Sequence, residues 1–132
     1  MVTTIPSAHG EVAVGDVLRT SRTYTVDEVR EFRGLSGYPD NSEPRYLPYL
    51  LVVAPLTELG GDIDYLSGRM TWAVTRPVAV GEEITAELEI TRLEPGPGVT
   101  KIAFDARIRC GDEVVVSGTS KGVVLVGEGA RR

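Results

Sequence analysis

The chain has 132 residues, a formal net charge of −5 and a sequence pI near 4.9. This length suits one domain with a single hydrophobic core. Lysines and arginines are not clustered in the sequence, except for Arg131 and Arg132, which argues against a surface that binds nucleic acid.

The single cysteine and the apolar segments indicate where the protein resides. Cys110 has no partner for an intrachain disulfide, and the only histidine, His9, lies in a segment without regular period, so a Cys-His catalytic pair is not favoured. No segment approaches the ~20 apolar residues of a membrane span, and residues 1–15 lack the regions of a signal peptide. We therefore expect a cytoplasmic protein that contacts neither membrane nor nucleic acid.

The first part of the chain predicts one strand and one short helix. Residues 1–15 are expected to form an extended N-terminal segment, and residues 16–24 predict a strand. Thr25 and Glu28 have the spacing of a capping box, and Gly37 suits a left-handed cap after the helix. The helix between them is about ten residues long. Its apolar residues recur at helical spacing: Val26, Val29, Phe32 and Leu35.

A second, strongly apolar helix is expected after an irregular loop at residues 37–46. Residues 47–59 are apolar on nearly all sides, and Pro48 and Gly60 are typical of the two ends of a helix. A buried strand is the competing interpretation, but the length of the segment favours a helix. Pro55 removes one backbone hydrogen bond and should kink the axis. A helix that is apolar on all sides should be buried on all sides.

The second half predicts strands. Apolar and polar residues alternate in residues 84–91 and 102–110, as in half-buried antiparallel strands, and residues 69–78 and 114–126 predict two more. The predicted order is strand, helix, helix, then four strands in a meander. One sheet can bury a wholly apolar helix only by curling around it. Residues 127–132 resemble a disordered tail, so the predicted domain spans residues 16–126.

Two segments resemble a known family. Residues 23–37, TYTVDEVREFRGLSG, resemble the opening of MaoC-like hotdog dehydratases, and residues 76–82, RPVAVGE, resemble the start of one of their strands. The resemblance implies a hotdog fold, an α+β domain in which a curled antiparallel sheet wraps around one long buried helix. It also implies a site between two protomers of a homodimer. The ligand would be an acyl thioester on coenzyme A (CoA) or acyl carrier protein.

A closer resemblance concerns residues 46–57, YLPYLLVVAPLT, and residues 60–67, GGDIDYLS. These look like the MaoC-type thioesterases of actinobacterial natural-product pathways, some of which add glycine to an enoyl thioester and then hydrolyse it. The hydratase members of the family use an aspartate and a histidine after the Ser-Gly pair. Here the aspartate is displaced to Asp40 and the histidine is absent. Since a group that titrates near neutrality is the natural agent of hydration, this difference favours hydrolysis.

Hydrolysis requires one carboxylate and donors for an oxyanion. Asp40, Glu43 and Glu58 are the candidate carboxylates, although Asp40 also fits an ordinary turn, Glu43 fits a solvated loop charge, and Glu58 stands at the unfavourable end of the helix dipole. The free amides of Tyr49 and Leu50, directly after Pro48, are the candidate donors. The same amides would stabilise an enolate, so conjugate addition of an amine such as glycine is also within reach.

Other residues are candidates for substrate binding. Arg45 would bind the phosphates of CoA or of a phosphopantetheine arm, or pair with a carboxylate, and Trp72 would form a pocket wall or part of the core. Asp62 and Asp64 do not have metal-ligand spacing, so we expect no metal ion and no other cofactor. The predicted substrate-binding set is Tyr38, Glu43, Arg45, Tyr46, Leu50 and Trp72, and the predicted catalytic set is Asp40, Tyr49 and Glu58.

Three hypotheses for the function remain open at this point. The first is an acyl-thioester hydrolase, with or without conjugate addition. The second is an enoyl-thioester hydratase or dehydratase with an unusual site. The third is a non-catalytic hotdog subunit or acyl-binding module that acts beside a catalytic partner.

Overall fold

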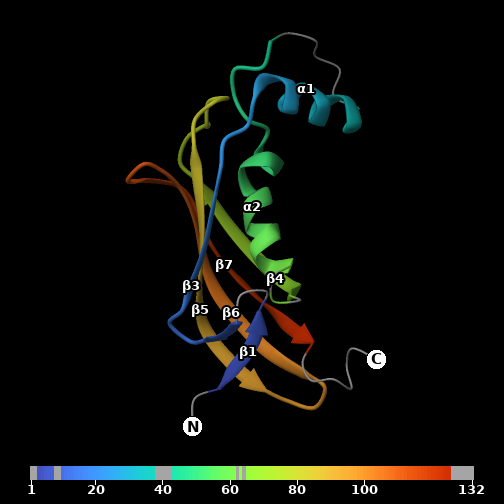
Figure 1. Cartoon of the computed structure of the whole chain (residues 1–132), viewed down its shortest axis with the longest axis vertical. Coiled ribbons are helices and arrows are strands. Elements are labelled where there is room, and N and C mark those ends of the chain that lie inside the picture. The colour runs from blue at the N-terminus through green and yellow to red at the C-terminus, as the bar shows by residue number, and fades with distance from the viewer. Residues whose placement is uncertain (1–2, 8–9, 38–42, 62, 64, 126–132) are drawn as a thin grey trace.

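A computed structural model describes residues 3–7, 10–37, 43–61, 63 and 65–125 (Figure 1). A two-stranded sheet, a five-stranded sheet and two helices make up the fold. In chain order the elements are β1 Thr4–Ser7, β2 Gly10–Ala13, β3 Val17–Arg22, α1 Val26–Leu35, α2 Tyr49–Gly61, β4 Tyr65–Val74, β5 Ile84–Pro95, β6 Val99–Cys110 and β7 Glu113–Leu125.

The five-stranded sheet is antiparallel throughout and has the order β3-β5-β6-β7-β4. The predicted four-strand meander is therefore wrong for its first strand, because β4 pairs with β7 at the far edge and not with β5. The chain between β4 and β5 crosses the end of the sheet, where Tyr46 and Ala79 form an isolated bridge. This crossing places β3 and β4 at opposite edges, and both strands contact α2.

The sheet curls around α2, as Figure 1 shows from the edge of the sheet. Alternating residues of the central strands face the helix and form the core, among them Ile84, Ala86, Leu88, Ile90, Ile102, Phe104, Ala106 and Ile108. This is the predicted hotdog architecture, an α+β fold with a curled antiparallel sheet around one long helix. Neither helix, within the described ranges, is long and apolar enough to cross a bilayer.

Helix α2 lies where the sequence predicts a helix and not a strand. It begins at Tyr49, directly after Pro48, continues through Pro55 and ends at Gly61, two residues beyond the predicted end. The prediction that the helix is buried on all sides is wrong. Leu50 is 64% exposed and Tyr49 is 41% exposed, because a five-stranded sheet covers only one side of a helix. The buried side consists of Val52, Pro55, Leu56, Leu59 and Gly60.

Helix α1 confirms the predicted caps. The Thr25 side chain accepts a hydrogen bond from the Glu28 amide at 3.1 Å, and the Glu28 carboxylate accepts one from the Thr25 amide at 3.0 Å. That backbone hydrogen bond, assisted by Arg22, lowers the pKa of Glu28. Gly37 follows the helix with a positive φ of 70°, the conformation that favours glycine.

The two-stranded sheet of β1 and β2 was not predicted. Ile5 pairs with Val12, and both side chains are buried in the core. Each strand has only four residues and β1 contains Pro6, so the sequence has too few positions to show a strand period.

A network of ion pairs covers the outer face of the sheet, on the side away from α2. The carboxylate of Glu87 accepts hydrogen bonds from Arg19 at 2.6 Å, Arg109 at 2.6 Å and Arg107 at 3.2 Å. The hydrogen bond from Arg109, followed by that from Arg19, lowers the pKa of Glu87 to about 2. The network therefore stabilises the fold above the ordinary glutamate pKa near 4.5, and this contribution is lost as the pH falls toward 2.

The Glu87→Gln variant is expected to lower the free energy of unfolding at pH 7 by about 2 to 3 kcal/mol, because it leaves a buried amide among the arginines. Urea unfolding between pH 7 and pH 3 measures this. The matched control is Glu94→Gln, which breaks the exposed pair with Arg92 and should cost at most about 1 kcal/mol. The difference in the free energy of unfolding between wild type and Glu87→Gln should become smaller as the pH falls below about 4.5. A difference that stays constant with pH would exclude the proposed charge contribution.

Candidate active site

A cavity of about 420 Å³ lies between α2 and β4, on the side of the helix that the sheet leaves open. Its volume falls within the range typical of small-molecule sites. Its walls are mainly apolar and aromatic, so an apolar chain would fit there. The helix contributes Tyr49, Leu50, Val53 and Thr57, and the sheet contributes Tyr65, Met70, Trp72 and Phe104.

Two glycines of β7 make room for the aromatic wall. Gly118 pairs with Trp72 across the strands, and a Cβ atom at Gly118 would lie 2.6 Å from Trp72 Cε3. At Gly122 a Cβ atom would lie 2.7 Å from Tyr65 Cε1. Both separations are too short for any real side chain, so the two rings can lie against β7 only because these positions are glycine.

The aromatic wall of the cavity includes one pair of hydroxyl groups that are hydrogen-bonded to each other. The Tyr65 and Ser120 hydroxyls are hydrogen-bonded to each other, and the Ser120 hydroxyl also lies 3.2 Å from the Arg69 carbonyl, to which it donates. The Tyr65 ring stands edge-on to Phe104, with ring centroids 4.8 Å apart. These contacts hold Tyr65 in place and leave its ring, not its hydroxyl, as the main surface offered to a ligand.

The N-terminus of α2 stands at one end of the cavity. The amides of Leu51 and Val52 donate to the Pro48 carbonyl at 3.0 and 3.2 Å. The amides of Tyr49 and Leu50 find no backbone acceptor in the described part of the chain, and the side chains of the same two residues line the cavity. The positive end of the helix dipole and two free donors thus lie beside an apolar space, an arrangement suited to a developing oxyanion.

The chain that leads into α2 is tied to the sheet. The Leu47 amide donates to the Val78 carbonyl at 2.8 Å, and the Val80 amide donates to the Arg45 carbonyl at 3.0 Å. Leu47 and Val78 are both buried. These contacts fix the position of Pro48, and hence of the free amides that follow it.

The structure brings three of the predicted site residues together. Tyr49, Leu50 and Trp72 all line the cavity. Burial raises the pKa of Tyr49, so its phenol stays protonated near neutral pH and is available as a hydrogen-bond donor. Tyr38 and Asp40 lie outside the described residues.

Glu58 lies apart from the cavity. It borders a separate small hollow with Arg19 and Thr20 of β3, whereas its neighbour Thr57 lines the cavity. Successive residues of a helix point about 100° apart, which separates Glu58 from its neighbour. The prediction that Glu58 shares a site with Tyr49 is therefore wrong within one protomer.

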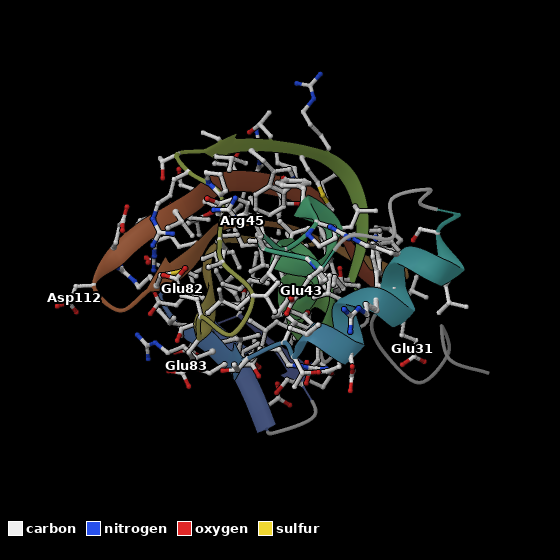
Figure 2. All side chains as sticks on the ribbon, turned by 90° about the horizontal axis from the view of Figure 1, so that it is seen from above. Glu31, Glu43, Arg45, Glu82, Glu83 and Asp112 are labelled. Atoms are coloured by element: carbon white, nitrogen blue, oxygen red, sulfur yellow. The ribbon has the colours of Figure 1, made fainter. Side chains whose placement is uncertain are left out.

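Three other predicted substrate-binding residues do not line the cavity. Glu43, Arg45 and Tyr46 are exposed, and Figure 2 labels Glu43 and Arg45 at the end of the molecule that carries α1. The Arg45 guanidinium lies 5.8 Å from the centre of the Tyr46 ring, in cation–π geometry. These residues could contact only the part of a ligand that projects beyond the cavity.

Cys110 lies in a different environment, at the end of β6. Burial raises the pKa of its thiol, and the neighbouring Glu82 raises it further. Hydrogen bonds from Arg76 lower the pKa of Glu82 to about 2, so this carboxylate stays ionised. A buried thiol beside an anion is poorly activated as a nucleophile.

Tyr65, Met70 and Phe104 line the cavity but are not among the predicted site residues. In the sequence, Phe104 is one apolar residue of an alternating strand. The available signal was in β7, where Gly118, Ser120 and Gly122 place small residues at alternate positions of one strand face. Small residues on the core side of a strand leave space for large neighbours.

Comparison with known proteins identifies the fold. No family model matches the chain, and no curated protein matches it. The solved (R)-hydratase from A. caviae involved in PHA biosynthesis is 23% identical with a TM-score of 0.70, and the match covers 87% of this chain and 98% of that one.

Two further solved structures agree. The MaoC-like dehydratase from Rhodospirillum rubrum is 15% identical with a TM-score of 0.66, over 88% of this chain and 94% of that one. The HadBC (3R-hydroxyacyl-ACP dehydratase) complex from Mycobacterium tuberculosis is 13% identical with a TM-score of 0.62, over 83% and 96%. These likenesses confirm the predicted hotdog fold. At such identities they concern the fold alone.

Proposed function

We propose that this chain is a MaoC-like hotdog enzyme that acts on acyl thioesters, with hydrolysis as its main reaction. The observation that carries the proposal is the position of two free helix amides, those of Tyr49 and Leu50, beside an apolar cavity of about 420 Å³. An acyl thioester has the matching parts, an apolar chain and a carbonyl that becomes an oxyanion on attack.

The acyl chain would lie among Val53, Met70 and Trp72, with the thioester carbonyl directed to the helix N-terminus. Asp40 would accept a proton from water as the water oxygen bonds to the carbonyl carbon. The amides would hold the resulting oxyanion until the carbon–sulfur bond breaks. The proton on Asp40 then passes to the departing thiolate, so the products are a carboxylic acid and a free thiol.

The same site would support conjugate addition to an α,β-unsaturated thioester. A neutral amine such as glycine would bond to the β-carbon, and the amides of Tyr49 and Leu50 would stabilise the enolate oxygen. The enolate then takes a proton at the α-carbon, while the amine loses one. Hydrolysis of the adduct would follow at the same carbonyl.

A second candidate is an enoyl-thioester hydratase or dehydratase, because the three solved structures named above are all named for those reactions. The family's histidine is absent from the loop before α2, and the only histidine of the chain is His9. Hydration without a group that titrates near neutrality would be slow. We therefore rank hydrolysis first.

Two assays on one sample separate these functions. Release of thiol from saturated and enoyl thioesters, on CoA and on carrier protein, reports hydrolysis, while loss of the enoyl absorbance reports addition of water or amine. Thiol release from saturated substrates supports the proposal. Loss of enoyl absorbance without thiol release supports the hydratase, and neither signal at any chain length supports a non-catalytic subunit.

A homodimer is part of the proposal, because two apolar surfaces of the protomer lack cover. Tyr49 and Leu50 of α2 are exposed, and the edge strand β4 exposes Leu66 at 56% and Val74 at 52%. An edge strand with exposed apolar residues readily pairs with another chain. A second copy of this chain would cover β4 and enclose the cavity.

Light scattering at micromolar concentration is expected to give twice the 14.2 kDa mass of one chain. The double variant Leu66→Lys and Val74→Lys should shift the protein to the monomer, because it places charge on the proposed interface. The matched control is Leu35→Lys, on an 84% exposed residue of α1, which should leave the mass unchanged. A monomeric wild type would contradict this part of the proposal.

A further inference from the structure

Another concave surface lies on the outer face of the sheet, opposite the side that faces α2. Its volume is about 310 Å³, and four neighbouring strands contribute one cation each: Arg69 of β4, Lys121 of β7, Lys101 of β6 and Arg92 of β5. The floor between them is apolar and shallow, and Ala103 and Val123 are part of it. We call this surface the basic hollow.

Strand register places three of these cations in one row across the sheet, and Lys101 in the neighbouring row, opposite Val123 and Glu94. Arg69 pairs with Lys121, Lys121 pairs with Ala103, and Ala103 pairs with Arg92. Arg69 and Lys121 are thus like charges directly opposite each other, which destabilises a sheet. Ala103 leaves a gap in the row between Lys121 and Arg92, because its side chain ends at Cβ.

The cations of the hollow are incompletely neutralised. Arg92 pairs with Glu94, but Arg69, Lys101 and Lys121 form no ion pair with any carboxylate in the described part of the chain. Asp105 stands one row away on the same face and outside the hollow. In a chain with a net charge of −5, uncompensated cations at one place are a cost to folding that a bound anion would offset.

Other arginines on the same face of the sheet have a carboxylate partner. Two rows further along the sheet, Arg19, Arg107 and Arg109 share the carboxylate of Glu87. That region is a closed network of ion pairs, while the hollow presents its charges to solvent. The contrast lies within one sheet face, so it is a property of the hollow and not of the face as a whole.

Backbone irregularities flank the hollow on both sides. The register shifts between Ser67 and Arg69 in β4 and between Ile90 and Arg92 in β5, so each arginine directly follows a bulge. Bulges redirect the side chains beside them and are frequent next to binding sites. Two bulges at the same level of the sheet therefore set the directions of the two arginines at either end of the row.

We propose that the basic hollow binds a nucleotide, with the flat base on the apolar floor and the phosphate groups between Arg69, Lys121 and Lys101. A cationic rim alone would fit any anion, but the apolar floor at Ala103 and Val123 adds a surface for a planar ring. Guanidinium groups both pair with phosphate and stack on aromatic rings, which suits the two arginines to this ligand. The proposal does not depend on the thioester chemistry of the cavity, which lies on the other face of β4.

Two sources would supply such a nucleotide: a free nucleotide, or the nucleotide end of CoA. Calorimetric titration of the full chain with adenosine 3′,5′-bisphosphate, adenosine and inorganic phosphate tests the shared chemistry. Titration with CoA and with pantetheine, which lacks the nucleotide, identifies the source. A parallel assay of thioester turnover on pantetheine substrates reports the cavity alone, so failure of one proposal is separate from failure of the other.

Variants locate the binding. Lys121→Gln should weaken binding of the bisphosphate by about tenfold or more, whereas Arg30→Gln, an equal charge change on α1, should leave it unchanged. Ala103→Leu fills the gap in the row without changing charge and should also weaken binding of the bisphosphate. Circular dichroism verifies that each variant is folded.

The outcomes are distinct. Binding of the bisphosphate that is tighter than that of phosphate or adenosine, and that Lys121→Gln weakens, supports the proposal. An accompanying loss of CoA affinity assigns the site to CoA, and unchanged CoA affinity assigns it to a free nucleotide. No binding of the bisphosphate, equal affinity for inorganic phosphate, or equal effects of Lys121→Gln and Arg30→Gln would overturn it.

Discussion

The Asp40→Asn substitution is expected to reduce thioester turnover by about a hundredfold or more, on the scale of the loss of a general base. An amide has nearly the size of a carboxylate but cannot accept the proton of the attacking water. Substrate affinity should change little, because the acyl chain binds to the apolar wall. Steady-state thiol release gives the rate, and titration with a non-hydrolysable thioether analogue gives the affinity.

The matched control for this prediction is Glu31→Gln, which removes an exposed carboxylate of α1. It should leave turnover within about twofold of wild type, as for a solvated surface charge. Unchanged turnover in Asp40→Asn would remove this residue from the mechanism. Glu58 would then be the carboxylate to test, although within one protomer it does not border the cavity.

The Gly118→Ala substitution is expected to lower the free energy of unfolding by about 3 kcal/mol, at the upper end of the cost of overpacking. Its Cβ atom would meet the Thr71 carbonyl and lie 2.6 Å from Trp72 Cε3, so β4 or the indole ring must move. Movement of the ring into the cavity should also weaken binding of the acyl analogue. Urea unfolding and titration of the analogue measure the two effects.

Gly34→Ala is the control for this second prediction. Nothing lies within 4 Å of a Cβ atom at Gly34, which stands in α1, so alanine should stabilise the protein by about 0.5 to 1 kcal/mol. The two glycine-to-alanine changes thus have opposite expected signs. Equal effects would show that the packing of Trp72 against β7 does not shape the cavity wall.

Local patterns were sufficient for much of the fold. The capping box at Thr25 and Glu28 located α1, and the alternation in β5 and β6 identified the strands and their buried faces. These features depend on residues close together in sequence. The edge position of β4 could not be predicted in the same way, because pairing with β7 depends on contacts between distant segments.

The prediction that α2 is buried on all sides was wrong for a different reason. Its composition indicated burial on all sides, yet Leu50 is largely exposed in the protomer. The sequence reports only that such a side chain avoids water. It does not tell whether the covering partner is the same chain, a second copy or a ligand. An apolar helix side that the sheet leaves open is the structural basis of both the cavity and the proposed dimer.

The site could be predicted only in part, because some of its features are local in the sequence and others arise only on folding. Tyr49 and Leu50 were found because the end of a helix is a local feature, and Trp72 because a large aromatic residue on a strand is conspicuous. Tyr65 and Phe104 meet only after folding, as do the cations of the basic hollow, which come from four strands. The sequence therefore showed no basic cluster where the structure has one.

In the proposed complex, the N-terminus of α2 receives the carbonyl of an acyl thioester. A crystal structure of the protein with a non-hydrolysable acyl-CoA analogue would show whether it does. We expect the carbonyl oxygen at about 3 Å from the amides of Tyr49 and Leu50, with the acyl chain between α2 and β4. A carbonyl bound away from these amides, or an acyl chain outside the cavity, would contradict the proposal.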